Sequence, residues 1–153
     1  MEVCAENETM GLGEDREREG DHYIRYILSH LNEQRLHDNF TDIALIVAGH
    51  RFRAHKAVLA ASSRFFHSFF KQVQEDTVVA IEGLSELAFG HLLEFIYTGI
   101  VYVEGVELDL VLKAAEFLQM DEAIIVLKKR FVRPSCYISG ILVFVMNWCQ
   151  SAF

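Results

Sequence analysis

Cysteine, proline and positive charge are all scarce in this 153-residue sequence. Its three cysteines, Cys4, Cys136 and Cys149, are odd in number and widely spaced, which argues against a disulfide framework and favours a reducing compartment. The single proline, Pro134, marks the predicted end of the folded unit, because proline interrupts regular structure. The acidic N-terminal residues do not resemble a secretory signal, so we expect the protein to be located in the cytosol or nucleus.

The formal net charge is −8, and most of it lies at the start of the chain. Residues 1 to 21 contain eight acidic side chains against Arg16 and Arg18, which leaves the remaining residues close to neutral. Binding to a phosphate backbone requires a basic excess, and no region of the sequence has one. We therefore predict no direct binding of nucleic acid by this chain.

Motifs of enzymes are also missing. The sequence contains no G-x-S-x-G, no G-x-x-x-x-G-K-[ST] and no G-x-G-x-x-G. The stretch GLGEDREREG resembles a glycine-rich loop only superficially, since its acids would repel phosphate and no strand precedes it. The seven histidines have no paired ligand spacing, so neither a metal ion nor a cofactor is predicted. The expectation is a protein that is not an enzyme.

Apolar residues, by contrast, make up 52% of the sequence, enough for the core of one domain. Residues 1 to 21 are predicted to form a flexible acidic arm, residues 22 to 133 the folded domain, and residues 134 to 153 an uncharged hydrophobic tail. The apolar core of the tail, Cys136 to Cys149, is shorter than the ~20 residues that span a bilayer. For this tail, packing against the domain or a contact at the membrane interface is favoured over insertion into the membrane. The alternative that the tail has no evolved role stays open.

The spacing of apolar residues predicts both helices and strands. An amphipathic helix is expected from Tyr23 to about His37. The segment TDIALIVAGHRFRAH has the pattern of a β-hairpin, and TVVAI that of a third strand. Two short helices are expected to meet at Ser62 and Ser63, and IVYVEG is a candidate for a further small strand. Three more helices follow from apolar stripes in residues 84–98, 108–118 and 121–131, and the fold class is predicted to be α+β.

Several motifs in this order closely resemble the BTB/POZ family. They are the NFTDIALIVAGHRFRAHKAVLAASSRFFHSFF stretch, HLLEFIYTGIVYVE and VLKAAEFLQM, and together the resemblance covers residues 22 to 132. It implies a BTB/POZ fold, in which a helical cluster is flanked by a small, mostly three-stranded sheet. It also implies a protein-interaction module that homo- or heterodimerises. The chain is most similar to the N-terminal domains of BTB zinc-finger transcription regulators. That subgroup is nuclear and mostly repressive, so a nuclear location is expected for this protein. An additional cytoplasmic location stays open.

The resemblance also implies two sets of functional residues. Members of the family usually dimerise through the first helix, whose apolar stripe here consists of Ile24, Ile27, Leu28 and Leu31. A charged pocket near the dimer interface is expected to contain Asp42, His55 and Lys56. Burying a carboxylate costs free energy unless a cation pairs with it, so the charges of Asp42 and Lys56 are expected to lie together. The alternative is that Asp42 begins a strand, Lys56 begins a helix and His55 is a core histidine.

The chain departs from the subgroup in two respects. It contains no ligand spacing typical of a zinc finger. The outer face of the first helix offers His30, Glu33 and His37, whereas members that bind corepressor peptides tend to carry basic side chains there, so corepressor docking of that kind is disfavoured. The segment TMGLG is also a poor strand, so swapping of a strand ahead of the first helix is not favoured.

A different binding role stays open. Many BTB proteins are substrate adaptors of cullin-type ubiquitin ligases and use an apolar-x-Glu motif after an aromatic helix. Phe70, Val73 and Glu75 match that pattern, although so short a motif occurs often by chance. The expected partners are therefore this chain itself or other BTB proteins, with a corepressor or a cullin as further candidates.

Overall fold

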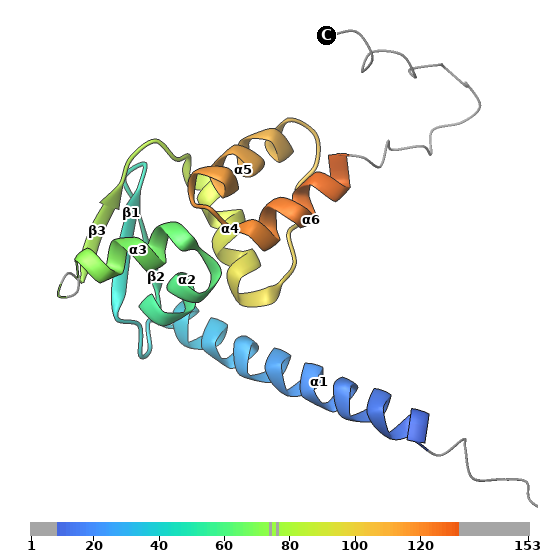
Figure 1. Cartoon of the computed structure of the whole chain (residues 1–153). Coiled ribbons are helices and arrows are strands. Elements are labelled where there is room, and N and C mark those ends of the chain that lie inside the picture. Colours follow the sequence, from blue (N-terminus) through green and yellow to red (C-terminus); the bar gives the residue numbers. More distant parts are fainter. Residues whose placement is uncertain (1–8, 74, 76, 132–153) are drawn as a thin grey trace, which may run out of the picture.

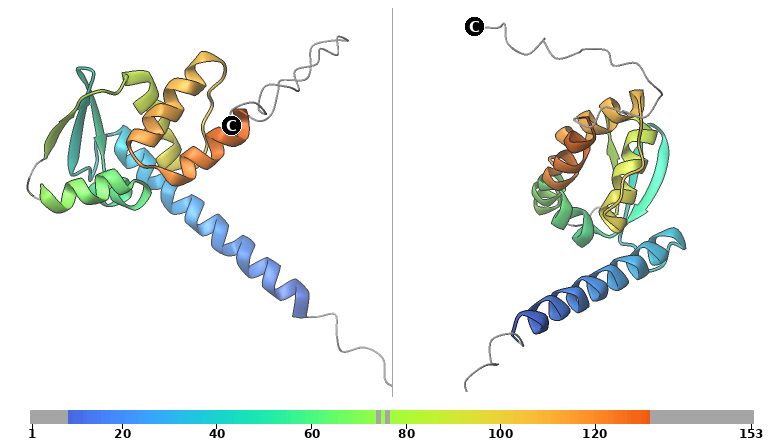
Figure 2. Two further views of the ribbon diagram at one scale, coloured as in Figure 1. Left: turned by 45° about the horizontal axis from the view of Figure 1, so that its top comes forward. Right: turned by 90° about the vertical axis from the view of Figure 1, so that its right-hand side faces the viewer.

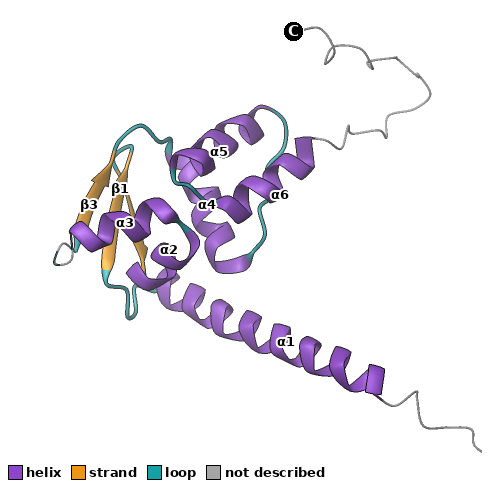
Figure 3. Ribbon diagram, in the orientation of Figure 1, coloured by secondary structure: helices purple, strands orange, loops and turns teal. Residues whose placement is uncertain are grey.

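The computed structural model describes residues 9–73, 75 and 77–131 of the chain. These residues form six helices and three strands, which are shown in Figures 1 and 3. In chain order the elements are α1 (Thr9–Leu36), β1 (Ile43–Val47), β2 (His50–Ala54), α2 (Lys56–Ser62), α3 (Arg64–Gln72), β3 (Val78–Ile81), α4 (Glu86–Thr98), α5 (Val106–Phe117) and α6 (Asp121–Phe131). The predicted α+β class is confirmed.

The three strands form one mixed sheet with the order β2-β1-β3. Strand β1 pairs antiparallel with β2, which places Leu45 opposite Phe52, and parallel with β3, which places Leu45 opposite Val79. The β1–β2 hairpin turns at Ala48 and Gly49, whose φ angles of 49° and 82° suit a type I′ turn. The predicted hairpin and the predicted third strand are both confirmed.

The core lies between the sheet and the helices that follow it. All side chains of β1 except Ile46 are buried, as expected for a central strand covered on both faces. Figure 1 shows α2 and α3 beside the sheet and α4, α5 and α6 gathered in the other half of the domain. Helix α4 contributes a large share of the buried side chains: Ala88, Phe89, Leu92, Leu93, Ile96 and Tyr97. The predicted helical cluster flanked by a small sheet is confirmed.

Helices α2 and α3 meet at Ser63, close to the junction predicted from the Ser62–Ser63 pair. The Ser63 hydroxyl caps α3 by accepting a hydrogen bond from the Phe66 N–H at 3.2 Å. The same hydroxyl donates to the Leu118 carbonyl at 2.6 Å. This buried serine therefore fixes the junction against the C-terminal end of α5.

The ends of α4 also follow the predicted signals. Ser85 caps its first turn by accepting from the Ala88 N–H at 3.2 Å, and Gly99 ends the helix with a left-handed φ of 71°. The small strand expected after Gly99 is not formed. Val101 and Val103 are buried while their neighbours are exposed, which is a strand-like alternation, but residues 100–104 pair with none of the three strands.

Helix α1 differs most from expectation, because it begins at Thr9 and not at Tyr23. Residues 9–21 of the predicted flexible arm are therefore helical. The glycines of this segment were given too much weight, since a glycine inside a helix costs only about 1 kcal/mol relative to alanine. Figure 2 shows that most of α1 extends away from the domain. The predicted tail, residues 134–153, lies outside the described residues.

Candidate interaction sites

The apolar stripe of α1 is largely uncovered within a single chain. Ile24 is 58% exposed and Ile27 40%, whereas Leu28 and Leu31 are half-buried. Tyr23 adds a further side chain that is 63% exposed. The sequence correctly placed these residues on one helix, but the domain itself covers only the C-terminal end of their stripe. Exposed apolar side chains at helical spacing are typical of a surface that contacts another protein.

Arg35 attaches the C-terminal end of α1 to the domain. Its guanidinium donates a hydrogen bond to the Glu94 carboxylate of α4 at 3.2 Å and another to the Asn32 side-chain oxygen at 2.8 Å. The same guanidinium lies 5.1 Å from the centre of the Tyr97 ring, within range of a cation–π contact. No role was predicted for Arg35 or Tyr97, although Tyr97 lies within the quoted motif LLEFIYTG.

The turn between α1 and β1 is held by a second arginine. Arg53 of β2 donates to the Asp38 carboxylate and to the Thr41 hydroxyl, the latter at 3.0 Å. The hydrogen bond from Thr41, followed by that from Arg53, keeps the pKa of Asp38 below its usual value. Asp38 and Phe40 have φ angles of 54° and 56°, which few residues other than glycine adopt readily. These contacts set the direction in which α1 leaves the sheet.

His55 and Tyr97 form a buried polar pair. The Tyr97 hydroxyl accepts a hydrogen bond from the His55 backbone N–H at 3.0 Å and lies 2.8 Å from His55 Nδ1. Whether Nδ1 donates or accepts in this contact is set by which ring nitrogen carries the proton. Among the described residues the buried Nε2 has no hydrogen-bond partner. His55 is thus a core histidine that fixes the start of α2.

Burial governs the protonation of this pair. Loss of solvent lowers the pKa of His55, an effect that the charge of Asp42 opposes and that of Arg35 reinforces. Burial likewise raises the pKa of the Tyr97 hydroxyl. A neutral imidazole therefore meets a neutral phenol near pH 7.

Asp42 lies next to His55 and Lys56, the other two residues named for the charged pocket. Its carboxylate accepts a hydrogen bond from the Lys56 backbone N–H at 2.7 Å. His55 occupies the N-cap position of α2 without a capping side chain, so Asp42 supplies the missing acceptor. Asp42 is exposed within the single chain, whereas the Lys56 ammonium lies 6.0 Å from the centre of the Phe70 ring. The three residues are therefore neighbours, and their role at an interface stays a prediction.

The three residues of the predicted cullin motif lie at the end of α3. Phe70 is half-buried and stacks on Phe66 with 5.6 Å between ring centres. Val73 is the half-buried C-cap residue, and its N–H donates to the Phe69 carbonyl at 3.1 Å. Glu75 is exposed. Of the three, only Glu75 is fully available to a partner.

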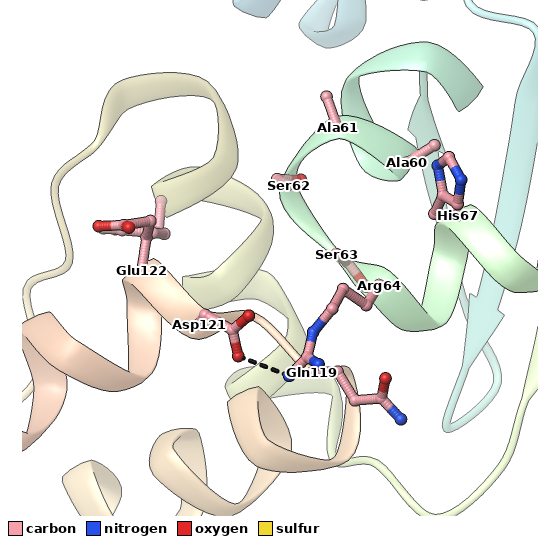
Figure 4. Close-up of a pocket in the computed structure, with 10 residues that line it drawn as sticks. Ala60, Ala61, Ser62, Ser63, Arg64, His67, Gln119, Asp121 and Glu122 are labelled. Carbon is pink, nitrogen blue, oxygen red and sulfur yellow. Dashed lines mark hydrogen bonds and ion pairs between the residues drawn. The ribbon is translucent and has the colours of Figure 1, made fainter.

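A hollow of about 380 Å³ lies where the α2–α3 junction faces the start of α6 (Figure 4). The Arg64 guanidinium donates to the Asp121 carboxylate across it at 2.8 Å. The hydroxyls of Ser62 and Ser63 are engaged by main-chain groups. Those four polar groups already have partners, and we assign the hollow no function.

Metal ligands do not gather anywhere in the described part of the chain, which contains no group of three or more candidate side chains close enough to hold an ion. His30 and His37 are exposed on α1, and the Nδ1 atom of each lies within 2.9 Å of the backbone carbonyl one turn earlier. Within the same ranges no helix is long and apolar enough to cross a bilayer.

A comparison with protein families decides the fold. The family described as BTB/POZ domain matches residues 31–134. The chain belongs to the BTB/POZ family. BTB domains are protein-interaction modules and not enzymes, and they generally associate with themselves or with other BTB proteins.

The relatives of this BTB domain are zinc-finger proteins. Zinc finger protein 131 from Homo sapiens is 56% identical over 107 residues, which make up 69% of this chain and 17% of that protein. Zinc finger and BTB domain-containing protein 41 from Homo sapiens is 37% identical over 113 residues, 73% of this chain and 12% of that protein. The chain thus matches less than a fifth of the length of either relative. The predicted similarity to BTB zinc-finger proteins is confirmed.

A solved structure supports the same assignment. The BTB domain of zebrafish PATZ1 superposes with a TM-score of 0.67 at 32% sequence identity. The match covers 71% of this chain and 91% of that domain. The described helices and sheet are therefore those of a BTB domain.

Proposed function

We propose that this BTB domain dimerises through the apolar stripe of α1, either with a second copy or with another BTB protein. The observation that carries the proposal is the exposure of Ile24 and Ile27, at 58% and 40%, on a helix attached to the domain only at its C-terminal end. Removing apolar surface from water stabilises an interface by roughly 25 cal/mol per Å². A partner helix laid along the stripe would provide that burial.

The cellular setting of the proposed dimer follows from the relatives. Because these are zinc-finger proteins, we infer that the domain belongs to a transcription regulator that acts in the nucleus, mostly as a repressor. The domain would supply the association between subunits and not contact DNA itself. A corepressor contact along the outer face of α1 is not part of the proposal, because His30, Glu33 and His37 occupy that face.

The dimer can be tested by placing charge in the stripe. The double variant Ile24→Glu/Ile27→Glu should weaken self-association by roughly 100-fold or more, because two carboxylates would have to be desolvated without partners. Sedimentation equilibrium of the full chain measures this directly. The matched control is Ile125→Glu on α6, since Ile125 is 45% exposed and lies on a different helix. A dimer that survives the double variant would disprove the proposed interface.

The charged pocket can be examined with the same measurement. Asp42→Asn keeps an oxygen that can accept from the Lys56 N–H but removes the negative charge. If Asp42 supports the interface through its charge, this variant weakens the dimer while the monomer stays folded. If the residue acts only as a cap for α2, Asp42→Asn dimerises as the wild type does.

The second candidate function is that of an adaptor for a cullin-type ubiquitin ligase. It is favoured by one observation: Glu75 is exposed directly after α3, beside a half-buried Val73 that ends the helix. The motif is short, and Phe70 packs inward against Phe66. We therefore rank this function below dimerisation.

A further inference from the structure

Helix α5 exposes an apolar stripe that the proposed dimer does not use. Val106, Leu110 and Phe117 follow one another at intervals of four and seven positions, so they lie on the same face of the helix. They are 84%, 47% and 47% exposed. The opposite face of α5 packs into the core through four side chains: Leu108, Val111, Ala114 and Ala115. The helix is thus apolar on two faces, but only one is covered.

The stripe is bounded on two sides by described structure. Asp109 and Lys113 form an ion pair of 2.7 Å on the same helix and flank it with polar groups. Phe117 contacts Phe65 of α3, with 5.5 Å between ring centres, so the apolar surface continues onto α3. Helix α1 contacts α4 and β2, and Figures 1 and 2 show α5 on the side of the domain away from α1. The α5 stripe is therefore separate from the stripe of α1.

Helix α6 ends on the side of the domain where α5 begins (Figure 1). Helices α5 and α6 are consecutive, pack against each other and are joined by a short turn at residues 118–120. Figure 1 shows that the end of α6 lies on the same side as the beginning of α5. Phe131, the last residue of α6, is 48% exposed. The end of α6 and the beginning of α5 thus lie on one side of the domain.

The sequence beyond α6 has the chemistry to cover such a surface. Residues 134–153 contain no charged side chain, and the segment Cys136 to Cys149 is predominantly apolar. The four residues 132–135 are enough to reverse the chain, since connections between packed helices commonly have 2–8 residues. Fourteen residues extend ~21 Å as a helix and further as a strand, whereas α5 is ~18 Å long. The segment is therefore long enough to run the length of α5.

We propose that residues 136–149 fold back onto α5 of the same chain and cover the Val106, Leu110 and Phe117 stripe. Each of the two surfaces would otherwise expose apolar side chains to water, and the segment 136–149 has no charged side chain of its own that docking would have to bury. The segment would then be a built-in cover of the domain, separate from the α1 interface.

Trp148 provides the measurement, because it is the single tryptophan of the sequence. In the full chain, docking should shift its fluorescence to shorter wavelength and slow its quenching by acrylamide several-fold. The variant Val106→Glu/Leu110→Glu should return both properties to those of a tryptophan in water. Both substituted positions are exposed, and position 106 is the first residue of α5, where a glutamate is favourable, so this variant should keep its fold, which circular dichroism checks.

The matched control is Leu87→Glu on α4, whose wild-type side chain is 45% exposed, close to the 47% of Leu110. It should leave Trp148 protected. The proposal is overturned if Trp148 is already exposed in the wild type, or if it stays protected in Val106→Glu/Leu110→Glu. It is also overturned if protection disappears on dilution, which would indicate contact with a second copy, or arises only with phosphatidylcholine vesicles, which would indicate a bilayer.

Discussion

Tyr97 ties the start of α2 to α4 through one oxygen atom. Its hydroxyl bonds both the backbone and the ring of His55, and all three groups are buried. Removing that oxygen leaves a buried N–H and a ring nitrogen without a partner, so Tyr97→Phe should lower the free energy of unfolding by about 1–3 kcal/mol. The same pair also makes stability depend on pH.

His55 should make the domain less stable in mild acid. Its pKa in the folded chain is lowered from the usual value of 6.5, so below that pH the unfolded chain binds a proton that the folded chain resists. The contribution is complete above pH 6.5 and is lost progressively as the pH falls. Urea unfolding at pH 7.5 and at a series of lower values measures the slope, and His55→Gln should flatten it, because glutamine has no proton to gain. An unchanged slope in the variant would show that other histidines cause the effect.

Individual residues were predicted unevenly from the sequence. The neighbourhood of Asp42, His55 and Lys56 was anticipated because the family motif contains all three. The hydrogen bonds of Tyr97 and the attachment by Arg35 were not, since each joins segments far apart in the chain, and no local pattern indicates such pairs. Burial of single residues was also harder to foresee: Val106 has the apolar side chain of a core residue, yet it is 84% exposed.

At the scale of the element, α1 offers a direct test of its unexpected length. Gly20 lies within the helix, and a Cβ atom added there would meet nothing within 4 Å. Because alanine favours a helix interior over glycine by about 1 kcal/mol, Gly20→Ala should increase the helix content seen by far-ultraviolet circular dichroism. The contrasting variant is Gly99→Ala, which should lower the melting temperature, since Gly99 has a φ of 71°. A Gly20→Ala chain without added helix content would argue against a helix at this position.

Elements with local signals were predicted well. The hairpin followed from an apolar run, a break at a glycine and a short alternating segment, and the boundaries of α4 followed from Ser85 and Gly99. The start of α1 was misplaced because residues 1 to 21, with three glycines and few large apolar side chains, were predicted to be a flexible arm. The segment 100–104 has the alternation of a strand, but a strand also needs a partner, and none of the three strands in the described structure runs beside it.

At the scale of the whole molecule, the two candidate functions can be separated by one titration. Dimerisation as proposed requires no cullin, so the full chain should give no heat when titrated calorimetrically with the N-terminal domain of the BTB-binding cullin. Tight binding that is lost in Val73→Ala/Glu75→Ala would favour the adaptor function instead. Sedimentation of the same samples should show that both proteins remain folded dimers, so that a negative result is not due to unfolding.

The overall architecture was predictable because local patterns and the family motifs agreed from residue 22 to residue 131. What the sequence did not reveal is how the elements divide between the core and the surface. The stripes of α1 and α5 have the same apolar composition as the buried stripes of other helices. Only the arrangement of the helices shows that Val106 and Ile24 are exposed, at 84% and 58%.

The way α1 extends from the domain also bears on how long the chain survives in the cell. In a chain without a partner the apolar stripe of α1 is exposed to solvent. Chaperones and quality-control proteases bind exposed apolar segments of this kind. Pairing would hide the stripe. On the proposed function, the abundance of the protein would therefore be set by the supply of its partner, and an excess of unpaired copies would be removed.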